Sequence, residues 1–481
     1  MPPTTQMKNT KMKEVLNVQP VINTNPKVMD KKYLIFWVIT IALPLAIMLI
    51  PVSEVFTAQL RLYLAITLCA IFMFAFEAIP NLIPALLLPS AYLLTKLAPA
   101  AAVFGPWSTY IPWMFMGGIL LANCIETTGL LRRIAYWSII KTGGTYNGIL
   151  YGILLAGIIL NLLIPAQAVI PLAAFTYGIC MALNLGKSKE SAGIMLAGAF
   201  AALLPLFFFY NPNFAVVLGA ASTVHPVKMT WFTYFFHNLP NIPWAFLCIF
   251  ITSKVFKPSK PFDVKDFIVE EHKRLGPMSI LEKKAMFVCL LLIAFLMTGG
   301  LHGIEIGWGF VIAAALMYMP GINVGTDQDI KRINFPILFF VTACMAIGSV
   351  ANVLGFGKLL AQALLPIMSS SGTTGTIGLV WLLCVVANFL MTPLAIMAAF
   401  SAPLAEVALG LGIDPLAFFY TIFHAVDQII FPYEYVLYLI YFAFGLITIK
   451  DFMKIFSIKM VTSIILILFV LIPYWKLIGL L

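Results

Sequence analysis

Long apolar blocks without a single charge constrain this chain more than any other feature. Residues 33–50 read YLIFWVITIALPLAIMLI, and residues 460–475 read MVTSIILILFVLIPYW. An apolar run of about 18 residues is long enough to cross a bilayer as a helix. Only 10% of the residues are charged, whereas a soluble domain carries about 25%. The sequence therefore predicts an all-α polytopic membrane protein.

The basic residues favour one orientation in the membrane. The net charge of +10 could indicate a nucleic-acid partner. If the N-terminus is cytoplasmic, however, every Lys and Arg falls on the cytoplasmic side except Arg61, Lys96, Lys228, Lys358 and Lys476. This distribution obeys the positive-inside rule and explains the charge without nucleic acid. We therefore expect a cytoplasmic N-terminus and an extracellular C-terminus in the plasma (inner) membrane.

The apolar pattern predicts about eleven spans, two re-entrant hairpins and two surface helices. Residues 1–32 are polar and lack a signal-peptide cleavage site, so they are expected to form a disordered cytoplasmic tail. The predicted spans are 33–52, 60–78, 82–97, 108–126, 191–220, 241–256, 285–300, 303–320, 335–353, 415–445 and 460–478. The surface helices are predicted at 127–142 and 355–366, and the hairpins at 146–184 and 374–411.

Four interruptions divide these apolar segments. The first hairpin contains NLLIPAQAVIP (161–171), and the second contains NFLMTPLA (388–395). Spans 191–220 and 415–445 are broken at YNPN (210–213) and around DQIIFPYE (427–434). Unsatisfied backbone is costly in hydrocarbon, so such breaks persist only inside protein or beside a water-filled cavity. Two hairpin tips and two broken helices are a recurring way to build a substrate site at the membrane midplane.

The two halves of the chain can be superposed. Gly129 corresponds to Gly355, and each is followed 32 or 33 residues later by a hairpin asparagine, Asn161 or Asn388. The predicted topology starts the first unit inside and the second outside, which makes them inverted repeats. The charged linker 257–284 separates the first repeat, 33–256, from the second, 285–481.

Three segments carry a resemblance to a known family. FEAIPNLIPALLLPSAYLL (76–94), MGGILLANCIETTGLLRRIA (116–135) and TPLAIMAAFSAPLAEVALGLGIDP (392–415) resemble signatures of the divalent anion/sodium symporter (DASS) family. The resemblance implies an elevator-type carrier of the ion transporter superfamily, assembled as a homodimer. It implies transport of dicarboxylates, tricarboxylates or sulfate, with sodium as the usual coupling ion and no other cofactor.

The chain departs from this family at the expected binding site. Family hairpin tips carry Ser-Asn-Thr, which binds substrate carboxylate and helps to coordinate sodium. Here the corresponding positions in the first tip are Pro165, Ala166 and Gln167. In the second tip they are Leu390, Met391 and Thr392 or, one residue later, Met391, Thr392 and Pro393. The architecture is therefore expected to transfer, whereas the substrate and sodium ligands do not transfer by residue identity.

Two carboxylates in span 415–445 are candidates for ion coupling. Asp427 and Glu434 bracket Pro432, and an intramembrane carboxylate costs at least about 2.5–3.5 kcal/mol. No basic partner is expected nearby, so each would be protonated, bound to Na⁺ or exposed to water. Gln428 and His424 could join them in a proton or sodium site. The alternative is a protonated carboxyl that is hydrogen-bonded to open backbone beside Pro432.

Side-chain amides provide the remaining candidates. Asn211 and Asn213 could replace the missing hydroxyls at the first break or simply cap a helix, and Gln167 is expected to contact substrate. Asn161 and Asn388 could coordinate the coupling ion or satisfy hairpin backbone. Glu77 and Glu126 lie at predicted cytoplasmic helix ends and are expected to be structural or interfacial. Helix N-termini beside the breaks would attract an anion without Lys or Arg.

A membrane enzyme and a channel are the alternatives to a transporter. A membrane enzyme would need a metal or nucleophile constellation, which the sequence lacks. A channel would use charge rings or filter loops. The expected function is secondary transport of a small organic anion, a di- or tricarboxylate, coupled to H⁺ or Na⁺ or working by exchange. A monocarboxylate, sulfate or zwitterion on the same fold is the alternative. The hairpins and broken spans would move, and the other helices would form the dimeric scaffold.

Overall fold

The computed structural model describes residues 31–481 except 55, 77–78, 259–264, 390 and several positions between 357 and 369. Every regular element in this part of the chain is a helix, and none is a strand. The predicted tail and most of the predicted surface helix 355–366 lie outside the described residues. Within them, the predicted all-α fold is confirmed.

The first half of the chain ends before the charged linker. Its helices are α2 (Lys31–Met48), α3 (Ala58–Phe76), α4 (Leu82–Leu94), α5 (Ala100–Val103), η1 (Gly105–Ser108), α6 (Tyr110–Thr128), α7 (Leu130–Thr142), α8 (Tyr146–Leu163), α9 (Val169–Ala182), α10 (Lys189–Leu203), η2 (Leu204–Phe207), α11 (Pro212–Ala221), α12 (Trp231–His237) and α13 (Asn241–Val255).

The second half follows the linker helix α14 (Lys265–Arg274), which the sequence did not predict. Its helices are α15 (Ile280–Met297), α16 (Gly299–His302), α17 (Ile306–Leu316), α18 (Asp327–Lys331), α19 (Phe335–Val353), α21 (Gly372–Ala387), α22 (Pro393–Gly410), α23 (Pro415–Ala425), η3 (Pro432–Glu434), α24 (Val436–Ala443), α25 (Ile449–Leu466), η4 (Ile467–Leu471) and α26 (Ile472–Leu477).

The helix lengths fit a fold with interrupted spans. Among the described residues, five helical segments are long and apolar enough to cross a membrane, and the number rises to seven if two bent pairs each count as one span. Shorter apolar helices include α9, α11, α21 and α23, which are the arms and half-helices expected beside the breaks. The predicted number of about eleven spans stays a prediction.

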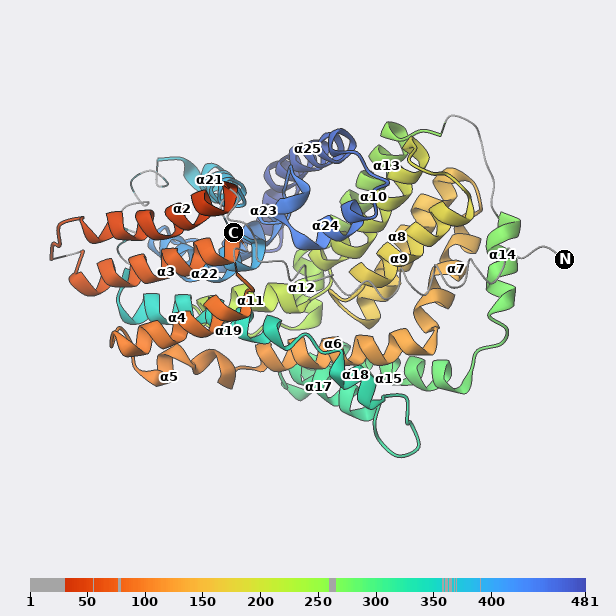
Figure 1. The fold of residues 1–481 in the computed structure, drawn as a ribbon, viewed down its shortest axis with the longest axis horizontal. Coiled ribbons are helices and arrows are strands. Elements are labelled where there is room, and N and C mark those ends of the chain that lie inside the picture. Colours follow the sequence, from red (N-terminus) through yellow and green to blue (C-terminus); the bar gives the residue numbers. More distant parts are fainter. Residues whose placement is uncertain are drawn as a thin grey trace.

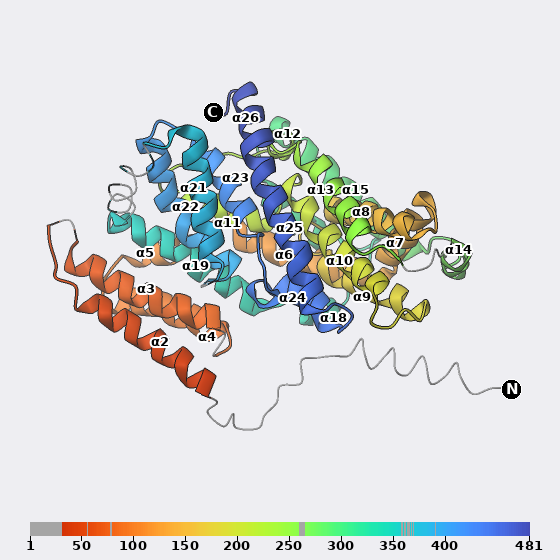
Figure 2. The same cartoon turned by 90° about the horizontal axis from the view of Figure 1, so that it is seen from above.

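The hairpins and the broken helices pack together in an equivalent way in both halves. The first hairpin, α8 and α9, packs on α10, and the second hairpin, α21 and α22, packs on α23. After each break the chain crosses over: α11 packs on α22, while α24 contacts α9 and α10. Figures 1 and 2 show α2 to α4 at one end of the molecule and α7 to α9 toward the other, with α23 to α25 between them.

Proline and asparagine explain where the chain breaks. Pro205 lies in the 3₁₀ turn that ends α10, and Pro212 occupies the first turn of α11, where its missing N–H costs no hydrogen bond. Pro393 begins α22 in the same way. The predicted interruptions of both spans and both hairpins therefore lie where the sequence placed them.

One boundary was predicted wrongly. The last span was expected to begin at residue 460, but α25 begins at Ile449. The side chain of Thr448 accepts a hydrogen bond from the Asp451 N–H at 3.1 Å, and the Thr448 hydroxyl donates to the Asp451 carboxylate at 2.6 Å. This cap starts the helix early, so residues assigned to a cytoplasmic loop belong to α25.

Glu126, which was predicted to be structural, is held at a helix end. Arg332 donates to the Glu126 carboxylate at 2.5 Å, and both side chains are exposed. The contact joins the end of α6 to the segment before α19. Glu77, assigned the same role, lies outside the described residues.

Candidate functional site

Asn161 fastens the tip of the first hairpin onto the end of α10. Its amide donates to the carbonyls of Gly157 at 2.9 Å and Ala202 at 3.0 Å, with a longer contact of 3.4 Å to Ala201. Its Oδ1 accepts from the Ala166 N–H at 3.1 Å. The close approach needs Gly157, because a Cβ there would lie 2.1 Å from the Ala201 carbonyl oxygen. The geometry thus favours the hairpin-backbone role of Asn161.

The tip itself is a short turn between α8 and α9. Pro165 is buried, and Ala166 and Gln167 are half-buried. Ala166 adopts φ +64°, a left-handed conformation that is uncommon for alanine. The Gln167 N–H donates to the Ile164 carbonyl at 3.0 Å and closes the turn.

Asn211 and Asn213 differ in their surroundings at the first break. Asn211 caps α11, since its Oδ1 accepts from the Phe214 N–H at 3.1 Å. Its amide donates to the carbonyls of Leu206 at 2.9 Å and Phe209 at 3.0 Å. Asn213 instead lines a small cavity. The capping alternative therefore describes Asn211, and Asn213 remains available for a ligand.

Asn388 has the role in the second hairpin that Asn161 has in the first. Its amide donates to the carbonyls of Ala425 at 3.1 Å and Gln428 at 3.2 Å, beyond the end of α23. The tip residues Met391 and Thr392 are half-buried, and Pro393 is buried as the first residue of α22. Within the described part of the chain, the Thr392 hydroxyl has no hydrogen-bond partner although this atom is buried.

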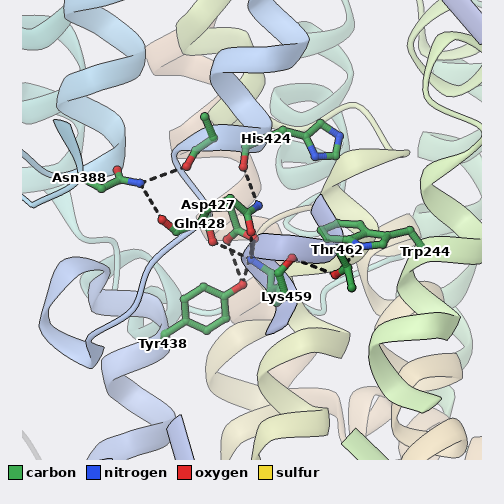
Figure 3. Close-up of polar contacts among 9 residues, drawn as sticks. Trp244, Asn388, His424, Asp427, Gln428, Tyr438, Lys459 and Thr462 are labelled. Carbon is green, nitrogen blue, oxygen red and sulfur yellow. Dashed lines mark hydrogen bonds and ion pairs between the residues drawn. The ribbon is translucent and has the colours of Figure 1, made fainter. Parts of the chain in front are cut away.

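The structure corrects the expectation that Asp427 has no basic partner. The Lys459 ammonium, on α25, forms an ion pair with the Asp427 carboxylate, and both residues are buried. Tyr438 donates to the same carboxylate at 2.9 Å. Figure 3 shows Asp427, Tyr438 and Lys459 meeting at the break. Asp427 is therefore charge-paired rather than alone in the membrane.

Lys459 is not among the residues that the sequence predicts for the site, because the positive-inside pattern assigns it to a cytoplasmic cluster of basic residues. It lies ten residues after Ile449, and a helix rises 1.5 Å per residue, so its Cα is about 15 Å from the start of α25. The usable signal was the T-x-x-D pattern at Thr448 and Asp451, which is typical of a helix N-terminus. An α25 that begins there carries Lys459 into the protein interior.

The other residues predicted around Asp427 lie close by but make different contacts. Gln428 donates to the His424 carbonyl at 2.7 Å, whereas the His424 ring stacks on Phe207 at 4.3 Å between ring centroids. In Figure 3 this ring points away from Lys459. Glu434 is separate: its carboxylate accepts from the N–H groups of Phe431 at 2.8 Å and Ile430 at 3.3 Å. The geometry gives Glu434 the hydrogen-bonding role that was its alternative.

A small cavity lies between the two breaks. Asn213 and Asp427 are among the residues that line it, with Leu203, Leu206, Phe207, Met397, Phe423, Val426 and Tyr435. Its volume is about 20 Å³, which is enough for about one water molecule. The cavity has no room for a larger molecule, so this conformation is closed between the two breaks.

The chemistry of this site is that of polar backbone ends and amides. Among the described residues, no group of three or more His, Cys, Asp or Glu side chains could hold a metal ion. The N-terminus of α22 and the Thr392 hydroxyl can donate to an anion. The carboxylate and carbonyl groups of the second break can hold a cation.

Comparisons with known proteins agree with this architecture. Residues 31–481 match the family described as the sodium:sulfate symporter transmembrane region. The crystal structure of the YdaH transporter from Alcanivorax borkumensis shares the fold, with a TM-score of 0.55 and 14% identity, over 93% of this chain and 98% of that one.

Similar sequences come from plants and bacteria. The chain is 22% identical to chloroplastic dicarboxylate transporter 1 of Arabidopsis thaliana over 71% of its length and 63% of the relative. It is 25% identical to a membrane protein of Cupriavidus necator over 49% of its length and 48% of the relative. The matches span less than two thirds of the length of these relatives. The family match over nearly the whole chain confirms the resemblance seen in the sequence: the protein belongs to the sodium:sulfate symporter family of membrane transporters.

Proposed function

We propose that this protein is a secondary transporter of small organic anions, with di- or tricarboxylates as substrates, in the plasma membrane. The main observation in support is that Asn161 and Asn388 hold two hairpin tips against two helix breaks, and that one cavity lies between these breaks. Such an arrangement is a recurring substrate site in transporters. The names of the two plant relatives, both dicarboxylate transporters, support the choice of substrate class.

Anion recognition in this proposal rests on dipoles rather than on a free cation. The cavity is lined by Asn213, and Gln167 and Thr392 belong to the two tips. The N-terminus of the 18-residue helix α22 adds positive partial charge. Lys459 contributes little net charge to the substrate because Asp427 neutralises it.

The proposed movement is an elevator motion of the hairpins and broken helices against a homodimeric scaffold. We now place α25 and α13 with the moving part, which revises their expected place in the scaffold. Lys459 of α25 is paired within the second break, and Trp244 of α13 donates to Thr462 of α25 at 3.2 Å. Sliding α25 past the break would separate a buried ion pair, at a cost of several kcal/mol.

The test is uptake of radiolabelled succinate, citrate and sulfate into proteoliposomes of defined pH and sodium gradient, with and without unlabelled substrate inside. Saturable uptake of succinate or citrate that is stimulated by internal substrate would support a carboxylate carrier and separate it from a channel. Uptake of sulfate alone would move the assignment to the inorganic anion. Absence of uptake of all three would contradict the proposed function.

A further inference from the structure

The head of Lys459 lies in an oxygen-lined position at the second break. Lys459 as a whole is only 2% exposed. The ammonium donates to the Asp427 backbone carbonyl at 2.6 Å and lies 3.4 Å from the Gln428 side-chain oxygen, in addition to its ion pair with the Asp427 carboxylate. A lysine ammonium has three N–H donors, so these three oxygens match its full donor capacity.

Aromatic rings close the remaining sides of this position. The ammonium lies 5.6 Å from the ring centroids of Tyr438 and Phe456 and 6.0 Å from that of Trp244. The faces of aromatic rings attract a cation, and the attraction is strongest when the cation is dehydrated. The surroundings of Lys459 are thus built for a positive charge without its water shell.

The place in the fold is one that suits a mobile cation. The half-helix α23 ends at Ala425, and the carbonyls that follow carry the negative partial charge of a helix C-terminus. In transporters with broken helices, half-helix C-termini and unwound carbonyls coordinate the coupling ion. Here the ammonium of the protein itself occupies that position, beside a carboxylate.

We propose that Lys459 is a tethered replacement for a coupling cation at the second break, so that transport draws no sodium there. This inference rests on the proposed transport function, because only a transporter has a coupling ion to replace. It explains how a carboxylate persists at membrane depth: the positive charge that balances Asp427 is covalently attached and does not leave during the cycle. The alternative is an ion pair that only stabilises the fold.

The two explanations differ in what happens when the ammonium is removed. Lys459→Ala leaves a carboxylate and two oxygens facing an open space. If this space is a cation position, sodium will enter it and stabilise the protein by mass action. If the pair is only structural, the variant will be destabilised equally in every salt of the same ionic strength.

The experiment measures the thermal midpoint of purified full-length protein in sodium chloride and in choline chloride at equal concentration. No substrate is present, so a failed uptake assay and a failed sodium assay are distinguishable. Wild type is expected to unfold at the same temperature in both salts. Lys459→Ala is expected to unfold at a lower temperature in choline and to regain several degrees in sodium, with saturation as sodium is raised.

Three variants control for other effects of the substitution. Lys459→Met fills the space with an apolar chain, so it should lose stability without a sodium response. Lys454→Ala removes an exposed charge from the same helix and should respond to neither salt. Asp427→Asn combined with Lys459→Ala removes the carboxylate, so the sodium response should disappear.

A further small variant keeps the test decisive if Lys459→Ala does not fold. Lys459→Ser leaves the same space and adds a hydroxyl that can bond to Asp427. If folded protein of the Ala or the Ser variant can be purified only in sodium-containing medium, that result would support the proposal. The proposal would be overturned if the folded variants unfolded at the same temperature in both salts, or if they failed to fold in either salt. It would also be overturned by a sodium-specific shift of wild type that Lys459→Met abolishes.

Discussion

The two helix breaks solve one problem with different chemistry. Each leaves backbone carbonyls without helical partners in the interior of the protein. At the first break, neutral donors from Asn161, Asn211, Tyr234 and Asn241 bind them. At the second break, Asn388 binds two carbonyls, but an ammonium binds the Asp427 carbonyl.

The two breaks therefore share one feature and differ in another. Both tip asparagines donate to backbone carbonyls of the helix that ends at the break, but Asn161 also accepts a hydrogen bond from the Ala166 N–H. The charges are confined to the second repeat, where Asp427 and Lys459 must be kept or lost together. A neutral break tolerates the loss of one donor, whereas a charged break leaves an uncompensated ion.

The largest effect should follow from breaking the charge balance. Asp427→Ala leaves Lys459 buried and unpaired, and loss of one partner of a buried pair costs about 3–5 kcal/mol. Chemical denaturation in lipid nanodiscs should show a loss of this size or no folded protein. Asp427→Ala combined with Lys459→Met removes both charges and should recover most of the stability. A double variant as unstable as the single one would show that packing, and not charge, dominates at the second break.

The equivalence of the tip asparagines can be tested by matched truncation. Asn161→Ala removes two good hydrogen bonds, a longer contact and the acceptor for Ala166, and should cost about 2–3 kcal/mol, since each bond contributes about 1 kcal/mol. Asn388→Ala removes two bonds and should cost about half as much. Amide exchange read by mass spectrometry should rise in 161–168 for the first variant and in 388–394 for the second. Exchange that rises equally at both tips in either variant would contradict independent fastening.

The ion pair between Arg133 and Glu282 provides a comparison for the buried pair at the second break. Arg133 on α7 donates to both oxygens of Glu282, at 2.8 and 3.1 Å. Burial opposes ionisation of this carboxyl, yet the hydrogen bonds from Arg133 and Ser279 outweigh it and lower its pKa from the ordinary value of 4.5. A lowered pKa means that the pair stabilises the fold above about pH 4.5 and that this stability is lost as the pH falls through the folded-state value.

Arg133→Ala should therefore cost about 2 kcal/mol at pH 7, less than the loss expected at Asp427. The difference in stability between wild type and variant should shrink as the pH falls below 4.5. Thermal unfolding from pH 7 to pH 3 measures this, with Arg132→Ala as the neighbouring control. A constant difference across this range would mean that the Arg133 contacts with the carbonyls of Leu275, Gly276 and Pro277 carry the effect instead.

The helix breaks and the partner of Asp427 show which parts of the site can be predicted from sequence and which cannot. Proline, asparagine and apolar run length located the hairpins and breaks, because each acts through the local backbone. The partner of Asp427 could not be found this way, because Lys459 follows it by 32 residues on another helix. Its burial depends on where α25 begins. Local patterns predict where a helix is interrupted, whereas the charge that balances the interruption is decided by packing between distant segments.

The smallest effect is expected at Glu434, where the geometry replaces a coupling role with a backbone cap. Its carboxylate accepts from the Phe431 and Ile430 N–H groups, and an amide oxygen can accept the same bonds. Glu434→Gln should therefore cost about 1 kcal/mol or less, and Glu434→Ala somewhat more, as for loss of a helix cap. The decisive measurement is the pH dependence of succinate uptake. If Glu434 is a cap, the Gln variant keeps the wild-type profile, because the proton-binding group it lost was not used in transport. A profile that flattens in Glu434→Gln while stability is unchanged would return Glu434 to the coupling site.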